Sequence, residues 1–164
     1  MKLTSSDLDY IMRDFPSVKL SYVKNIHKKV SSANIFLAIP KGQKYFAWFR
    51  HFKKYSVCFF LEYDNRKRRI KSIFVKNCCF SENLCTQKGT ILYGTIVEVN
   101  NQPFFFIEDI YFDKGYDLKS KNNFEKLNML IFNKPNELFK ILYYYYLSPK
   151  ELLMHKKLTK NTKL

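Results

Sequence analysis

The chain predicts an α+β protein of one domain, with an antiparallel-rich β-sheet flanked by N-terminal and C-terminal helices. Its 164 residues suffice for one domain with a core. An apolar fraction of 46% with only 4 Gly and 5 Pro indicates a folded chain rather than a disordered one. The apolar period is helical up to about residue 33, extended through the middle and helical again near the end. We therefore expect a helical segment at 1–33, a β-rich core at 34–135, and C-terminal helices with a basic tail at 136–164.

Two helices are expected before the sheet. Ser6-Asp7-Leu8-Asp9 resembles a capping box with Asp in place of Glu, and Pro16 should stop the helix, which ends at about Asp14. Ser17 can cap a second helix that runs through Lys29, because apolar residues recur there at spacings of three and four.

Extended segments rich in aromatic and β-branched residues follow, and they predict a sheet of about six strands. Their ranges are 35–39, 45–50, 56–63, 68–75, 90–99 and 104–112. Asp64-Asn65 predicts a tight turn, since both residues tolerate the left-handed backbone region. Residues 100–103 are the expected loop of the last hairpin.

The chain then returns to a helical pattern. We expect a helix at 124–130, a second one capped by Asn136 that runs through Tyr146, and a last one that starts at Ser148-Pro149 and ends near Lys157.

The formal net charge of +15 predicts a nucleic acid or an acidic protein surface as partner, with simple solubility as the alternative. The four cysteines occur with no signal peptide and no long apolar run, so we expect a reducing compartment and no transmembrane segment. The cysteine and histidine spacings lack the usual zinc pattern, and free thiols are expected. We expect no metal and no cofactor.

Three stretches carry a resemblance to a known family, and they contain all four glycines of the chain. They are Ile39-Pro40-Lys41-Gly42-Gln43-Lys44, residues 89–96 with the sequence Gly-Thr-Ile-Leu-Tyr-Gly-Thr-Ile, and residues 103–115, an apolar strand followed by the turn at Gly115. In this order the first two resemble the two active-site strands of the covalent nucleotidyltransferases, the family of mRNA guanylyltransferases and nucleic-acid ligases, and the third resembles the apolar strand and glycine turn that follow them there. That family has a Lys-x-Asp-Gly box and, about fifty residues later, an Asp-Gly-Glu strand. The resemblance implies a truncated nucleotidyltransferase fold of the ATP-grasp-like type.

The resemblance also implies that the reactive residues are lost. Ile39 stands at the position of the nucleophilic lysine and Lys41 at that of the aspartate, while Gly42 is kept. In the later strand Tyr93 and Thr95 replace the two metal-binding carboxylates around Gly94. An isoleucine cannot attack an α-phosphate, so no enzymatic activity is expected.

The pattern is similar to the non-catalytic snurportin branch and to small proteins of nucleocytoplasmic large DNA viruses. The resemblance therefore implies a viral structural or interaction component, such as a minor capsid-associated protein that binds other viral proteins. Its expected location is the virion and the host-cell cytoplasm. The alternatives are an RNA- or cap-binding module of snurportin type and an accessory subunit of viral transcription or capping.

Two groups of residues are candidates for binding nucleic acid or a partner. The first could stack a base on an aromatic ring and hold its phosphate, and the second is a basic run at an expected hairpin tip. The first group is Lys44, Trp48, Arg50, Lys53 and Lys54, and the second is Arg66, Lys67, Arg68, Arg69 and Lys71. For the first group, the alternatives are that Trp48 belongs to the sheet core, or that Arg50 covers its indole at an interface with another protein. For the second, the alternative is that the basic run protects an edge strand from aggregation.

Overall fold

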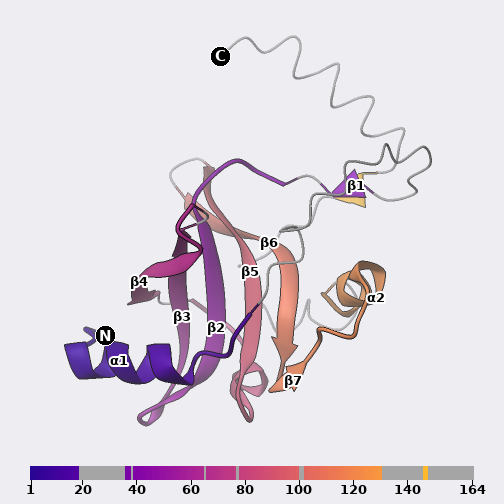
Figure 1. The fold of residues 1–164 in the computed structure, drawn as a ribbon. Coiled ribbons are helices and arrows are strands. Elements are labelled where there is room, and N and C mark those ends of the chain that lie inside the picture. The colour runs from indigo at the N-terminus through magenta and orange to yellow at the C-terminus, as the bar shows by residue number, and fades with distance from the viewer. Residues whose placement is uncertain are drawn as a thin grey trace. The chain divides into compact units, whose positions relative to one another are not determined.

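The computed structural model describes residues 1–18, 36–37, 39–64, 66–76, 78–99, 102–130 and 146–147. The chain divides into two compact units, one from residues 1–18 and 40–143 and the other from 19–39 and 144–164. The first unit is an α+β fold with a curled, antiparallel six-stranded sheet (Figure 1). The second contains a short antiparallel pair of β1 (Phe36–Leu37) and β8 (Tyr146–Leu147). The domain boundaries expected at 33/34 and 135/136 lie outside the described residues.

Helix α1 (Ser5–Asp14) confirms the first expected helix and its end. Its cap is Thr4, not Ser6: the Thr4 side chain accepts from the Asp7 backbone N–H, and the Asp7 carboxylate accepts from the Thr4 N–H. The Asp-for-Glu capping box therefore exists, two residues earlier than expected. The expected helix up to Lys29 falls almost wholly outside the described residues.

The six strands of the sheet are ordered β4-β3-β2-β5-β6-β7, and every neighbouring pair is antiparallel. Their bounds are β2 (Lys44–Phe52), β3 (Tyr55–Asp64), β4 (Arg69–Val75), β5 (Thr90–Val99), β6 (Gln102–Asp113) and β7 (Tyr116–Asp117). Five of the expected strands match β2 to β6. The expected strand at 35–39 is not part of this sheet, since β1 pairs with β8, and the short β7 takes the sixth place.

Both faces of the sheet are packed. Phe46 and Trp48 of β2 lie on one face with Phe59 of β3, because side chains alternate along a strand. On the opposite face, the rings of Phe60 on β3 and Phe105 on β6 meet at 5.2 Å although two strands separate them in the sheet. The sheet must therefore curl around that face.

The connection between β4 and β5 covers the face that carries Phe49. It includes the short 3₁₀ helix η2 (Glu82–Cys85), and the ring of Phe80 lies 5.0 Å from that of Phe49. Leu84 and Cys85 of this connection are fully buried. This connection thus contributes apolar side chains to the core.

Gly94 allows β5 and β6 to approach each other closely. A Cβ at Gly94 would lie 1.9 Å from the carbonyl oxygen of Phe106, far inside contact distance. The glycine stands beside a register shift, since Tyr93 pairs with Asp109 and Gly94 with Ile107. Glu108 is the extra residue of this β-bulge.

Helix α2 (Asn123–Asn128) confirms the helix expected at 124–130 and lies beside β6 (Figure 1). Its cap is Asn122, which forms a capping box with Glu125. The prediction that a helix runs through Tyr146 is wrong at that residue, because Tyr146 lies in β8 and pairs with Leu37. The remainder of that helix and the last expected helix lie outside the described residues.

Candidate interaction surface

Trp48, the candidate stacking residue, lies inside the fold. Its side chain is 1% exposed, and the ring of Phe15 meets it edge-on at a centroid distance of 5.3 Å. The indole Nε1 donates to the carbonyl oxygen of Lys88 at 2.9 Å, so its polar atom is satisfied. A base could stack on Trp48 only after Phe15 and Arg50 had moved away.

Arg50 covers the indole from α1's side of the sheet. Its guanidinium lies 4.4 Å from the Trp48 ring centroid and is ion-paired with Asp14 at the end of α1. Lys53, in the next turn, pairs with Asp7 at 3.0 Å. Both cations therefore hold α1 against the sheet, while Lys54 is exposed. Arg50 covers the Trp48 indole within the chain, and an interface with another protein at this place stays a prediction.

Lys44 belongs to a covered polar network. Its Nζ lies 2.5 Å from Glu108 Oε1, 2.5 Å from Thr95 Oγ1 and 3.4 Å from the Pro40 carbonyl oxygen. The Lys44 side chain is 13% exposed and that of Glu108 only 3%. An ammonium group has three protons to donate, and these three oxygens can accept them all.

A second buried ion pair lies next to the first in sequence. Lys126 of α2 lies 3.1 Å from Asp109, and its Nζ is 4.9 Å from the ring centroid of Tyr111. Both side chains are less than a tenth exposed. Sequence reasoning missed Glu108, Asp109 and Lys126. The β-bulge of β6 sets the directions in which the Glu108 and Asp109 side chains point, and this bulge depends on the register of β5 and β6, which the sequence does not reveal.

The positions aligned with the nucleotidyltransferase motifs differ in their exposure to solvent. Tyr93 and Thr95 are fully buried, whereas Ile39 and Lys41 are exposed. Gly42 is exposed too, and a Cβ there would lie 2.6 Å from the Thr95 methyl group. Tyr93 packs against the ring of Phe46 at 4.9 Å.

The expected basic hairpin is present at the turn between β3 and β4. We call its five cations, Arg66, Lys67, Arg68, Arg69 and Lys71, the basic tip, and all five are exposed. Lys71 pairs with Glu62 at 3.0 Å. Within the described ranges no carboxylate forms an ion pair with any of the other four. These four charges are available to a partner.

Asp64 holds the backbone of the turn that carries these charges. Its Oδ1 accepts from the backbone N–H groups of Lys67 at 3.0 Å and Arg66 at 2.9 Å. These bonds, with the Lys67 and Arg69 charges, hold the Asp64 pKa below its ordinary value. Likewise, the Ser72 hydroxyl and then Lys71 lower the pKa of Glu62. These hydrogen bonds order the described part of the hairpin turn, which carries long cationic side chains.

Two other kinds of site are absent from the part of the chain that the structure describes. No group of three or more His, Cys, Asp or Glu side chains among these residues is placed to hold a metal ion. No described helix has the length and apolar character needed to cross a membrane.

Comparison of the chain with protein-family models, with curated proteins and with solved structures finds no match.

Proposed function

We propose that the chain is a non-catalytic interaction protein with a degenerate nucleotidyltransferase-like fold. In this proposal it joins a larger assembly through the basic tip, as a minor capsid-associated component of a virus particle would. The observation that carries the proposal is the exposure of Arg66, Lys67, Arg68 and Arg69 without carboxylate partners among the described residues. A fixed hairpin that presents several cations suits an acidic surface, because it can make contact without distorting the core.

The state of Lys44 supports a non-catalytic role. A lysine nucleophile must present a neutral amine with a free lone pair to the α-phosphate. The Lys44 Nζ instead donates to Glu108, Thr95 and the Pro40 carbonyl oxygen, so its hydrogen-bonding capacity is used inside the fold. The family position of the nucleophile is Ile39, which has no such chemistry.

Covalent labelling tests this part of the proposal. Protein incubated with radiolabelled GTP or ATP and Mg²⁺ or Mn²⁺ should carry no label after denaturing electrophoresis. A labelled adduct that maps to Lys41 or Lys44 would make the chain an enzyme and would end the proposal.

RNA is the second candidate partner, and the basic tip favours it as well. With Trp48 covered, contact with RNA would fall mainly on phosphates, so affinity should be strongly salt-dependent and weakly sequence-dependent. The measurement is fluorescence anisotropy of a labelled single-stranded RNA over a salt series. If RNA is the partner, Arg68→Glu with Arg69→Glu should weaken binding and flatten the log–log slope by about 0.7 for each phosphate that is no longer neutralised.

The matched control reverses two exposed lysines elsewhere, Lys119→Glu with Lys121→Glu, which changes net charge equally. An equal decrease of affinity in both variants would show that total charge, not the tip, attracts RNA. No binding at low salt would leave an acidic protein surface as the partner.

A further inference from the structure

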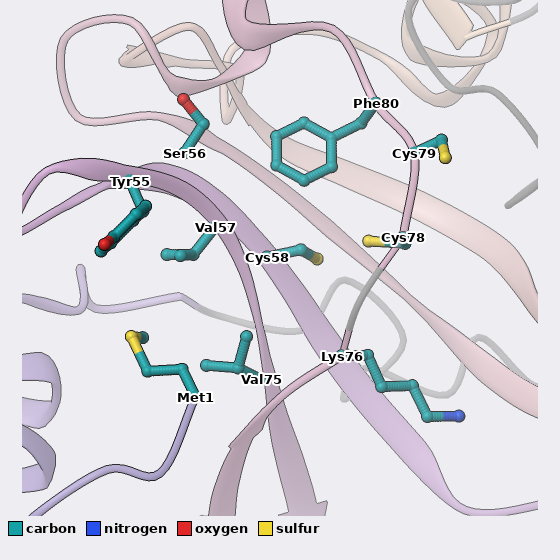
Figure 2. A pocket seen from close by; sticks show the side chains of 10 residues that line it. All are labelled: Met1, Tyr55, Ser56, Val57, Cys58, Val75, Lys76, Cys78, Cys79 and Phe80. Carbon is teal, nitrogen blue, oxygen red and sulfur yellow. The ribbon is translucent and has the colours of Figure 1, made fainter.

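An apolar pocket of about 630 Å³ lies beside β3 and brings three cysteines together. Figure 2 shows Met1, Val57 and Val75 on one side of it, and Cys58, Cys78 and Phe80 on the other. Cys58 belongs to β3 and is buried, whereas Cys78 lies in the connection between β4 and η2 and is partly exposed. The pocket therefore gives small molecules a route to a thiol that contacts a buried one.

The two sulfur atoms face each other. In Figure 2 the side chains of Cys58 and Cys78 point toward one another, while that of Cys79 points away. Both side chains line the same pocket. Adjacent cysteines in the sequence thus have different surroundings, and of Cys78 and Cys79 it is Cys78 that has a second thiol beside it.

The surroundings also make the thiols chemically unequal. The hydrogen bond from Cys58 and then the charge of Lys76 lower the pKa of Cys78, against the effect of its partial burial. Burial raises the pKa of Cys58, and it raises that of Cys85 to about 11. Since the thiolate is the nucleophile, Cys78 is the most reactive of these three.

We propose that Cys58 and Cys78 form a reversible redox pair, in which Cys78 attacks an incoming small disulfide and Cys58 resolves the product. The Cys78 thiolate attacks one sulfur of R–S–S–R, a mixed disulfide forms, and RS⁻ leaves and takes a proton from water. Cys58 then gives its proton to the hydroxide left by that water and attacks the Cys78 sulfur, which releases the second RS⁻ to be protonated by solvent. The two cysteines are oxidised to a disulfide, and the small disulfide is reduced to two thiols.

The test uses the whole protein and glutathione disulfide as the probe. After incubation at several ratios of oxidised to reduced glutathione, free thiols are alkylated, and the protein is digested with trypsin without reduction. Cleavage after Lys54, Arg66, Lys76 and Lys88 isolates Cys58 in peptide 55–66 and the other three cysteines in peptide 77–88. Mass spectrometry should find these two peptides joined, and reduced glutathione should separate them.

Single substitutions identify the partner of Cys58. Cys78→Ser should abolish the joined peptides, whereas Cys79→Ser, the matched control at the next residue, should leave their yield unchanged. Cys58→Ala should stop the reaction at a glutathione adduct on Cys78. The proposal is overturned if the folded wild-type protein forms no joined peptides at any ratio, or if Cys78→Ser still forms them.

Discussion

At the scale of single residues, Trp48 shows how neighbours decide the role of a side chain. Its ring is enclosed by Phe15, Phe59 and the Arg50 guanidinium, and its N–H is satisfied by a backbone carbonyl. Such surroundings are those of a core aromatic, whose burial stabilises the fold through apolar area and ring contacts.

We therefore expect Trp48→Ala to destabilise the protein by about 3–5 kcal/mol, as removal of a large core aromatic does. Trp48 is the only tryptophan, so far-UV circular dichroism during urea unfolding is the suitable measurement. Tyr55→Ala, which truncates a ring that is 66% exposed on the neighbouring strand, is the control and should change stability little. A Trp48→Ala protein of unchanged stability that had lost cap or RNA binding would instead establish a stacking pocket.

At the scale of elements, the ranges of five strands could be predicted from the sequence, but the partner of β1 could not. Alternation and β-branched or aromatic content are local, so β2 to β6 are visible in the chain. The partner of β1 is β8, more than a hundred residues away, and no local pattern specifies such a contact. The bulge at Glu108 likewise depends on the register of β5 and β6, so neither buried ion pair could be predicted from the sequence.

Helix α1 offers a pH-dependent prediction. The backbone N–H of Thr4 and then the Lys53 ammonium hold the Asp7 pKa below its ordinary value. A carboxyl whose pKa is lowered on folding stabilises the fold above its unfolded pKa of about 4, and this contribution is lost as the pH falls through the lower, folded value.

Asp7→Asn should therefore reduce the Tm above about pH 4 and flatten the fall of the Tm as the pH drops below about 4, as followed by thermal unfolding at each pH. The exposed Asp9 of the same helix provides the control, Asp9→Asn. If both variants gave the same pH profile, the capping box and the Lys53 contact would not be the cause.

At the scale of the whole molecule, the most distinctive property of the chain is its large positive charge. Of the cations predicted as binding residues, Lys44, Arg50 and Lys53 bind carboxylates of the fold itself. The net charge of +15 follows from composition, but only the folded chain shows that these three cations pair with its own carboxylates, whereas Arg66 to Arg69 of the basic tip form no ion pair within the described residues. An assembly held by exposed cations should weaken with salt, because screening acts most on exposed charges.

The most direct measurement is native size-exclusion chromatography of lysate from cells that make the protein, with the chain followed by immunoblot. We predict that the wild-type chain elutes with a large assembly at low salt, and that Arg68→Glu with Arg69→Glu moves it to the position of the free chain. The Lys119→Glu/Lys121→Glu control should stay with the assembly. A wild-type chain that elutes alone, or a tip variant that stays assembled, would contradict the proposal that the basic tip joins this protein to its partners.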